Sequence, residues 1–269
     1  MYNIKNHKNM LGSIIGDIVG SVYEFDNTKD YNFKLLTPKS TFTDDTVMTL
    51  AVAKWLTEDS EHRHSTLVQA MQELGRRHLN RGYGDHFFYW LLTPSPKPYN
   101  SWGNGSGMRV SPVGFYTQTL EEALVLARIS AEVTHNHPEG IKGAQAIAAS
   151  IFLTRHGMGK EELRSYIEKT FGYNLHRTIE QMRPTYEFDV SCMGSTPEAI
   201  IAYLDSHDFE DAIRLAVSLG GDSDTIAAMA GPIAQAAYGL PKELSSSCYA
   251  RLTPDLQDIL KAFEDKVGM

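Results

Sequence analysis

The chain has 269 residues, of which 42% are apolar and 22% are charged, a balance typical of a globular domain with a deep core. Its formal net charge of −8 argues against general nucleic-acid binding or a membrane-surface role, because phosphate-rich partners favour basic faces. The two cysteines, Cys192 and Cys248, lie far apart without a C-x-x-C pair, which supports neither a disulfide framework nor a thiolate zinc site. A cytoplasmic location is the simplest expectation.

The N-terminal region superficially resembles a signal peptide, because two lysines precede the apolar run Met10–Tyr23. Asp17 interrupts that run and no small-residue cleavage site follows, so we expect a buried helix of the mature protein. No other stretch approaches the roughly 20 uncharged apolar residues that span a bilayer. We expect one domain over residues 1–269, with residues 1–9 as a flexible extension.

Helical periodicity dominates the chain, whereas alternating strand patterns are nearly absent and Val190–Met193 is too short to define a sheet. We therefore predict a single compact all-α domain. A long irregular region, 80–117, is predicted to be a functional loop, because such loops are uncommon in compact domains and its aromatic residues argue against disorder. The predicted helices are Leu11–Tyr23, Val47–Leu56, Leu67–Leu79, Leu120–Val133, Ile141–Thr154, Glu161–Phe171, Pro197–Leu204, Phe209–Leu219, Ile226–Tyr238 and Pro254–Val267.

Local signals support several helix boundaries. Thr196 and Pro197 suit an N-cap and the first position of a helix, and Gly157 and Gly172 suit helix ends.

A row of glycines, Gly12, Gly16 and Gly20, follows one face of the first predicted helix. Each glycine costs about 1 kcal/mol of helix propensity relative to alanine, so we expect another backbone or a ligand to approach closely here. Asp17 and Glu24 are about two helical turns apart and would share a face. Both could bind a ligand or act in catalysis. Alternatively, Asp17 makes a buried hydrogen bond and Glu24 is a solvated helix end.

Two acidic motifs, Thr43–Thr46 (TDDT) and Gly220–Thr225 (GGDSDT), directly precede predicted helices. Each could simply cap its helix, with Thr43 or Asp222 as the cap and the other acids favouring the positive end of the helix dipole. Four carboxylates without a nearby lysine or arginine in sequence would need a cation if they converged. Oxygen ligands without histidine or cysteine select magnesium, manganese or calcium, and four carboxylates with hydroxyls suit two ions about 3.5–4 Å apart.

Two further motifs could contact a ligand. The glycines of Ser101–Arg109 (SWGNGSGMR) leave backbone N–H groups that could cradle a diphosphate, although an ordinary tight turn has the same spacing. This segment is neither a P-loop nor G-x-G-x-x-G. Thr134–His137 (THNH) offers two histidines without a third soft ligand, so a hydrogen bond to phosphate or ribose is favoured over metal binding.

Taken together, these residues resemble the ADP-ribosylglycohydrolase family, which includes the dinitrogenase reductase-activating glycohydrolases. The chain departs from the family pattern at Gly107, where alanine is usual, and at Ser223, where threonine is common. The family also contains crystallin-like members that have lost activity. The matching segments are Gly16-Asp17 through Tyr23-Glu24, Phe42–Thr46, Arg81–Gly84, Gly103–Arg109, Thr134-His135 and Gly220–Thr225.

The resemblance implies an all-α domain whose central cleft holds two Mg²⁺ or Mn²⁺ ions. It further implies hydrolysis of the C1″ bond between ADP-ribose and an N- or O-linked acceptor on a protein or other target, with ADP-ribose as a product. A non-catalytic ADP-ribose binder, a crystallin-like protein and a dimetal phosphohydrolase are the alternatives. The implied metal ligands are Thr43, Asp44, Asp45, Asp222, Asp224 and Thr225; the implied catalytic residues are Glu24, Asp44 and Asp45; and the implied substrate-binding residues are Trp102, Gly103, Asn104, Gly105, Ser106, Gly107, Met108 and His135.

Overall fold

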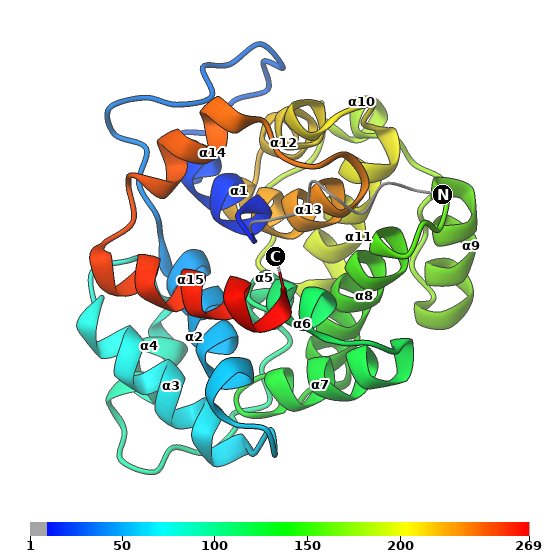
Figure 1. Cartoon of the computed structure of the whole chain (residues 1–269). Coiled ribbons are helices and arrows are strands. Elements are labelled where there is room, and N and C mark those ends of the chain that lie inside the picture. The colour runs from blue at the N-terminus through cyan, green and yellow to red at the C-terminus, as the bar shows by residue number, and fades with distance from the viewer. Residues whose placement is uncertain (1–9, 269) are drawn as a thin grey trace.

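The computed structural model describes residues 10–268, and over this range the chain is helical (Figure 1). Its only pairing of extended backbone within that range is an isolated antiparallel bridge between Gly103 and Ser191. The predicted all-α class is confirmed, whereas the predicted extension, residues 1–9, lies outside the described residues. The helices are α1 (Gly12–Gly20), α2 (Asp44–Glu58), α3 (His64–Arg77), α4 (Asp85–Leu92), α5 (Gly105–Met108), α6 (Ser111–Tyr116), α7 (Leu120–Glu132), α8 (Pro138–Arg155), α9 (Lys160–Phe171), α10 (Ile179–Met182), α11 (Cys192–Asp205), α12 (Phe209–Ser218), α13 (Ser223–Tyr238), α14 (Lys242–Tyr249) and α15 (Pro254–Val267).

Every helix predicted from periodicity is present, but the uniformly irregular region 80–117 is a wrong prediction because it contains α4, α5 and α6. These helices are too short to show a clear helical period. The predicted helix start at Thr196-Pro197 is also wrong. The Ser191 hydroxyl accepts a hydrogen bond from the Gly194 N–H at 3.0 Å, so α11 begins upstream and Pro197 lies inside it.

The first helix ends earlier than predicted, at Gly20 instead of Tyr23. The Ser21 hydroxyl donates a hydrogen bond to the carbonyl of Ile18, and the Tyr23 N–H donates to the carbonyl of Gly20, which closes a tight turn. Glu24 therefore lies in a turn beyond α1, and the prediction that it ends the helix is wrong. The predicted glycine ends are confirmed: Gly157 and Gly172 both adopt the left-handed conformation that follows a helix.

The glycine row of α1 allows this helix to approach the backbone of α13 (Figure 1). A Cβ atom at Gly16 would lie 2.1 Å from the carbonyl oxygen of Ala227, and one at Gly20 would lie 2.3 Å from the Cα of Asp224. The expected close approach is therefore made by another backbone. It places the end of α1 directly beside the second acidic motif.

The packing of α1 against both α2 and α13 brings together the starts of these two helices, which are far apart in the sequence. The helix α1 contacts both α2 and α13, while α8, α11 and α12 pack around α13 and α3, α6 and α15 pack around α2. Burial of apolar side chains across these interfaces is the main favourable contribution to folding. Among the described helices, none has the length and apolar character needed to cross a membrane.

Candidate functional site

The two acidic motifs, which begin α2 and α13, meet in the folded chain. The Thr225 hydroxyl donates to the Asp45 carboxylate at 3.3 Å across 180 residues of sequence, and the Thr43 hydroxyl oxygen lies 3.4 Å from the same carboxylate oxygen. Carboxylate oxygens of Glu24, Asp222 and Asp224 lie within 4.8 Å of one another, an arrangement that could hold a metal ion. The structure thus brings together residues that the sequence keeps far apart.

The fully buried carboxylate of Asp17 holds the first motif in place. It accepts hydrogen bonds from the backbone N–H groups of Thr43, at 3.0 Å, and Thr46, at 3.1 Å. The hydroxyls of both threonines donate to it as well. Because Asp17 does not line the cavity described below, this geometry favours the buried hydrogen-bond role over a ligand role.

Capping explains one motif but not the other. The Thr43 hydroxyl accepts from the Asp45 N–H at 3.3 Å, so Thr43 caps α2. The Asp222 carboxylate does not cap α13 and instead accepts from the Asn104 side-chain amide at 2.7 Å. Asp224 accepts from the Thr225 N–H at 2.9 Å. Capping by the Asp222 side chain is therefore a wrong alternative.

The carboxylates share an environment that disfavours negative charge. Burial and the neighbouring carboxylates raise the pKa of Asp44, Asp45 and Asp224 well above the usual value. Burial, together with the charges of Asp222 and Asp17, raises the pKa of Glu24 to about 7. The Asp45 Oδ1 atom is buried and has no hydrogen-bond partner among residues 10–268. This donor set fits hard divalent cations, which bind carboxylate oxygen and relieve the repulsion.

The turn that carries Glu24 is fastened to the second motif by Asn27. The Asn27 side-chain amide donates to the carbonyls of Glu24, at 2.8 Å, and Gly221, at 3.0 Å. Its oxygen accepts from the Gly221 N–H at 2.6 Å. Gly221 has a positive φ of 70°, which a glycine adopts without strain. One asparagine thus joins the Glu24 turn to the residue before Asp222.

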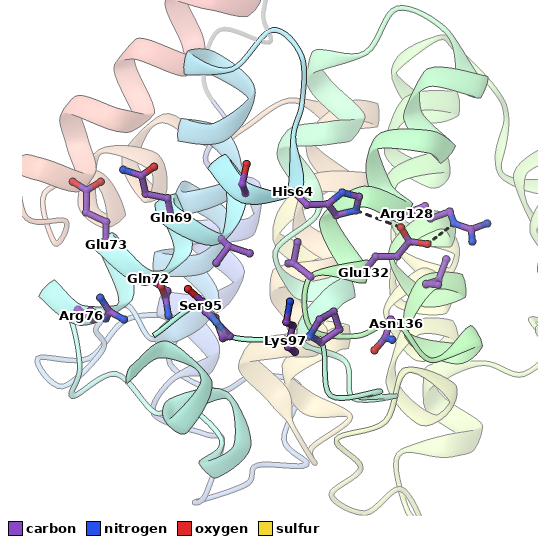
Figure 2. A pocket seen from close by; sticks show the side chains of 16 residues that line it. His64, Gln69, Gln72, Glu73, Arg76, Ser95, Lys97, Arg128, Glu132 and Asn136 are labelled. Carbon is purple, nitrogen blue, oxygen red and sulfur yellow. Dashed lines mark hydrogen bonds and ion pairs between the residues drawn. The ribbon is translucent and has the colours of Figure 1, made fainter. Parts of the chain in front are cut away.

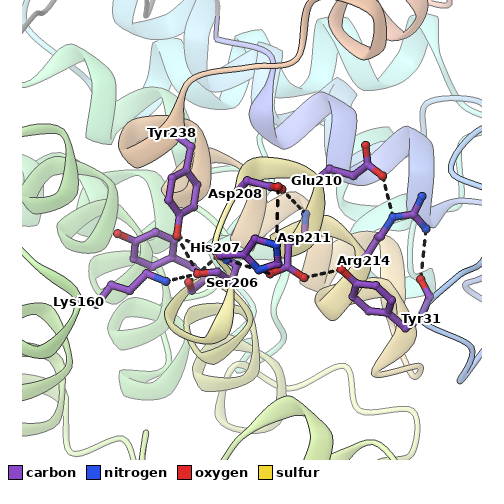
Figure 3. A network of polar contacts seen from close by, with 10 residues as sticks. Tyr31, Lys160, Ser206, His207, Asp208, Glu210, Asp211, Arg214 and Tyr238 are labelled. Atoms are coloured by element: carbon purple, nitrogen blue, oxygen red, sulfur yellow. Dashed lines mark hydrogen bonds and ion pairs between the residues drawn. The ribbon is translucent and has the colours of Figure 1, made fainter.

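The segment after this turn is anchored to α12 (Figure 3). The Tyr31 hydroxyl donates to Asp211 at 2.6 Å, and the Arg214 guanidinium donates to the carbonyl of Tyr31 at 3.2 Å. Asp211 also contacts His207 in the same network. These contacts tie the long connection between α1 and α2 to a helix that packs against α13.

A cavity of about 490 Å³ opens onto the acidic cluster. It includes most of the sequence-predicted site residues but not Thr43, Trp102, Ser106 or Gly107. Four phenylalanine or tyrosine residues that belong to none of the sequence motifs, Phe25, Phe87, Tyr99 and Phe188, also line it. The lining comprises Glu24, Phe25, Asp44, Asp45, Gly82, Gly84, Asp85, His86, Phe87, Tyr99, Ser101, Gly103, Asn104, Gly105, Met108, Arg109, His135, Phe188, Val190, Asp222, Asp224 and Thr225.

A larger groove of about 1100 Å³ lies elsewhere, along α3 and α7 (Figure 2). Its Glu132 carboxylate is already paired with Arg128, at 2.6 Å, and with His64, at 3.4 Å. Within the described chain, the cluster of three acidic side chains close enough to hold a metal lies in the smaller cavity. We therefore assign the candidate active site to the cavity beside the acidic cluster, although the groove along α3 and α7 is larger.

The glycine-rich segment forms part of the cavity wall, but not as the open loop that was predicted. Its centre is the short helix α5, in which the buried Ser106 hydroxyl donates to the carbonyl of Gly140 at 2.7 Å. A Cβ atom at Gly107 would lie 2.8 Å from the sulfur of Met229, so Gly107 faces α13. Trp102 is 48% exposed and does not line the cavity. Ser106 and Gly107 thus pack behind the residues that line the cavity and do not line it themselves.

The two histidines of the remaining motif, Thr134–His137, have different roles. The His137 ring accepts a hydrogen bond from the Glu139 N–H at 3.1 Å and caps α8. His135 lines the cavity and is buried. The two histidines of this motif thus have different surroundings.

At the cavity mouth, Phe25 and Phe188 stack with their ring centroids 6.1 Å apart and their planes inclined by 16°. Both rings are exposed, at 85% and 46% of their surface. They come from the turn after α1 and from the segment before α11. No sequence period marks this pair, because it depends on two irregular segments that meet only in the folded chain.

Together the fold and the site define an all-helical protein with a carboxylate-rich cavity suited to divalent cations. The family model of the ADP-ribosylglycohydrolases matches residues 7–267. The chain belongs to the ADP-ribosylglycohydrolase family. This membership supports an ADP-ribosyl hydrolase activity in general.

Individual relatives agree with that assignment. The chain is 27% identical to ADP-ribosylhydrolase ARH3 of Homo sapiens, covering 89% of this chain and 87% of the relative. It is also 27% identical to ADP-ribosylarginine hydrolase Tri1 of Pseudomonas putida (strain GB-1), covering 86% and 70%. A solved ADP-ribosylglycohydrolase-related protein complex has the same fold, with a TM-score of 0.73, 23% identity and coverage of 98% and 99%.

Proposed function

We propose that this chain hydrolyses the C1″ glycosidic bond between ADP-ribose and an acceptor on a protein or other target, and so reverses ADP-ribosylation. The observation that carries the proposal is the contact between Asp45 and Thr225, because it unites the two acidic motifs at one cavity. Family membership supports the substrate class, and the similarity to the ADP-ribosylarginine hydrolase Tri1 supports arginine as one acceptor to test.

In this proposal the acidic cluster and its neighbouring carboxylates bind two divalent cations, Mg²⁺ or Mn²⁺. When bound, such ions supply Lewis acidity and lower the pKa of a coordinated water. Their deprotonated carboxylate ligands would lie at the starts of α2 and α13, where the helix dipoles favour negative charge. The residues proposed to hold them are Thr43, Asp44, Asp45, Asp222, Asp224 and Thr225.

The other residues of the cavity bind and orient the substrate in this proposal. Glu24 lies beside Asp222 and Asp224 and exchanges a proton with the attacking water or the leaving group. Gly103, Gly105 and Met108 line the wall against which the diphosphate and proximal ribose are held. Asn104 orients Asp222 through its amide. Trp102 stays a proposed contact for the adenosine at the rim, because about half of its surface is exposed.

The decisive experiment for this function is an assay of the Mg²⁺-loaded and Mn²⁺-loaded chain against peptides and nucleic acids that carry ADP-ribose on arginine, serine or a nucleobase. Mass spectrometry of the products is expected to show intact ADP-ribose and the unmodified acceptor. Release of AMP or phosphate would instead identify a phosphohydrolase. Binding of ADP-ribose without turnover of any linkage would identify a non-catalytic binder.

Metal ions are expected to stabilise the protein more strongly as the pH rises. A group whose pKa is raised on folding, as that of Glu24 is to about 7, binds protons more tightly in the folded state. In metal-free protein its contribution to stability is therefore present below the unfolded pKa of about 4.5 and is lost as the pH rises through about 7. Bound metal replaces those protons, and so its stabilising effect grows over the same window.

The measurement compares melting temperatures with Mg²⁺ and with chelator at about pH 5.5 and about pH 8. The difference between the two conditions should be larger at the higher pH, with each kcal/mol of stabilisation worth roughly 2–4 °C for a domain of this size. An equal difference at both pH values would contradict the proposal that these carboxylates are the metal ligands.

A further inference from the structure

A buried arginine, Arg109, caps the end of α5 and is part of the cavity lining. The Arg109 side chain has no exposed surface, and its guanidinium donates to the carbonyl of Gly105 at 2.9 Å and to the carbonyl of Ser130 at 2.8 Å. It also donates to the Thr134 hydroxyl at 2.9 Å. All of these acceptors are uncharged. A buried cation without a carboxylate partner is costly, so the role of Arg109 calls for a physical explanation.

The Thr134 hydroxyl contacts both Arg109 and His135 and so links the two side chains. The Thr134 hydroxyl oxygen, which is fully buried, lies 2.7 Å from the Nδ1 atom of His135. A guanidinium can only donate, so the hydroxyl oxygen accepts from Arg109 and its single proton remains to be donated. Among the described residues, the His135 Nδ1 atom is the one acceptor that this proton meets.

The opposite arrangement leaves a buried polar group unsatisfied. If His135 carried its proton on Nδ1, both Arg109 and His135 would donate to the Thr134 oxygen. The hydroxyl proton would then have no acceptor within the described structure, and an unsatisfied buried donor is unfavourable. Burial and the nearby guanidinium hold the pKa of His135 well below its usual value, so the ring is neutral and carries one proton.

The other ring nitrogen of His135 faces the glycine-lined part of the cavity. The Nε2 atom lies 3.1 Å from the position that a Cβ atom would take at Gly105, and 3.6 Å from that position at Gly103. Both glycines and His135 line the cavity. The absence of two side chains therefore leaves space beside Nε2, where a ligand oxygen can approach an N–H donor.

We propose that Arg109 and Thr134 are positioning residues that fix His135 as its Nε2–H tautomer, so that the cavity offers a neutral hydrogen-bond donor to an oxygen of ADP-ribose. The identity of the ligand rests on the proposed function, whereas the tautomer rests on the Arg109–Thr134–His135 contacts alone. A neutral donor suits this place because a second positive charge beside Arg109 would be repelled.

The test is ¹⁵N NMR of the imidazole in the full Mg²⁺-loaded chain, with the His135 signals assigned by comparison with a His135→Gln variant. The wild type is expected to show protonated Nε2 and unprotonated Nδ1. Thr134→Ser retains the hydroxyl and should retain this pattern. Thr134→Val removes the hydroxyl at nearly constant volume and should yield a mixture of tautomers or the Nδ1–H form.

Calorimetric titration with ADP-ribose provides the functional readout. Thr134→Val is expected to weaken binding by about 3–10-fold, because one hydrogen bond to the ligand is lost in part, while Thr134→Ser binds like the wild type. In turnover assays the loss should raise KM more than it lowers kcat. If Thr134 had only a structural role, Thr134→Val would change neither the protonation of the His135 ring nor the relative sizes of the effects on KM and kcat.

The outcomes separate this inference from the proposed function. Protonated Nδ1 in the wild type, or an unchanged tautomer and unchanged ADP-ribose affinity in Thr134→Val, would overturn the inference whatever the enzyme hydrolyses. If Thr134→Val fails to fold, the wild-type spectrum alone decides the tautomer. Failure of the wild type to bind ADP-ribose would contradict the proposed function and the ligand named here, even with the predicted tautomer in place.

Discussion

Replacement of Asp224 by asparagine is expected to abolish metal binding and hydrolysis together, with a loss of turnover greater than about 100-fold. Changing residues that merely support metal ligands already costs about 10–100-fold, and Asp224 is proposed to be a ligand itself. The side chain is 2% exposed and lies with Glu24 and Asp222 within the cluster that could hold an ion. Asparagine keeps the shape of the side chain but removes its charge. Metal content by mass spectrometry and turnover on the same preparation are the measurements.

The same variant should also change the response to chelator. Asp224 repels its neighbours when metal is absent, so metal-free Asp224→Asn is expected to melt no lower than the metal-free wild type, and chelator should not shift it. Asp59→Asn is the matched control, because Asp59 is also buried but binds Arg63 and Thr66 far from the cavity. That control should lose stability and keep its metal. Full metal content and activity in Asp224→Asn would contradict the proposal that Asp224 is a metal ligand.

The long helices could be predicted from the sequence because their apolar spacing persists over several turns. The helices that were missed are short or poor in helical signals: α5 has four residues, and α14 contains three consecutive serines. Serine competes for its own backbone hydrogen bonds and weakens the intrinsic helical preference. Their helical state depends on tertiary packing, such as the contact of α5 with α8 and of α14 with α1.

The candidate site could be predicted only as a set of residue types. The TDDT and GGDSDT motifs indicated carboxylates at two helix starts, and the glycine row of α1 indicated a close backbone contact. Their meeting point depends on how α1 fits between α2 and α13. The role of Asp17, as an acceptor for Thr43 and Thr46, was one of two open possibilities.

Other features of the site leave no signal in a single sequence. The stacking of Phe25 on Phe188 joins two irregular segments. The hydrogen bond between Asn104 and Asp222, and the bridge that pairs Gly103 with Ser191, join segments that are far apart in the sequence. These contacts are long-range, so their partners cannot be found from local spacing.

The Glu24→Gln variant is expected to lose turnover by about 10²–10⁴-fold while it retains ADP-ribose binding, because general acid–base groups contribute to rate by that factor. Glu24 lies in a turn and not at the end of a helix as predicted, yet its carboxylate lies beside those of Asp222 and Asp224. Its half-buried environment raises its pKa to about 7, near the range in which a group can both accept and release a proton. Glutamine keeps the size of the side chain but cannot exchange that proton.

Single-turnover hydrolysis, calorimetric binding of ADP-ribose and metal content should be measured on the same preparation of Glu24→Gln. Glu187→Gln is a suitable control, because it removes an exposed carboxylate from the segment that carries Phe188 without altering the acidic cluster. The control should hydrolyse the substrate at the wild-type rate. Near-normal hydrolysis by Glu24→Gln would eliminate Glu24 as the acid–base group. Loss of hydrolysis together with metal would make Glu24 a ligand, and the group that activates water would then be sought among Asp44, Asp45 and Asp224, whose side chains line the same cavity.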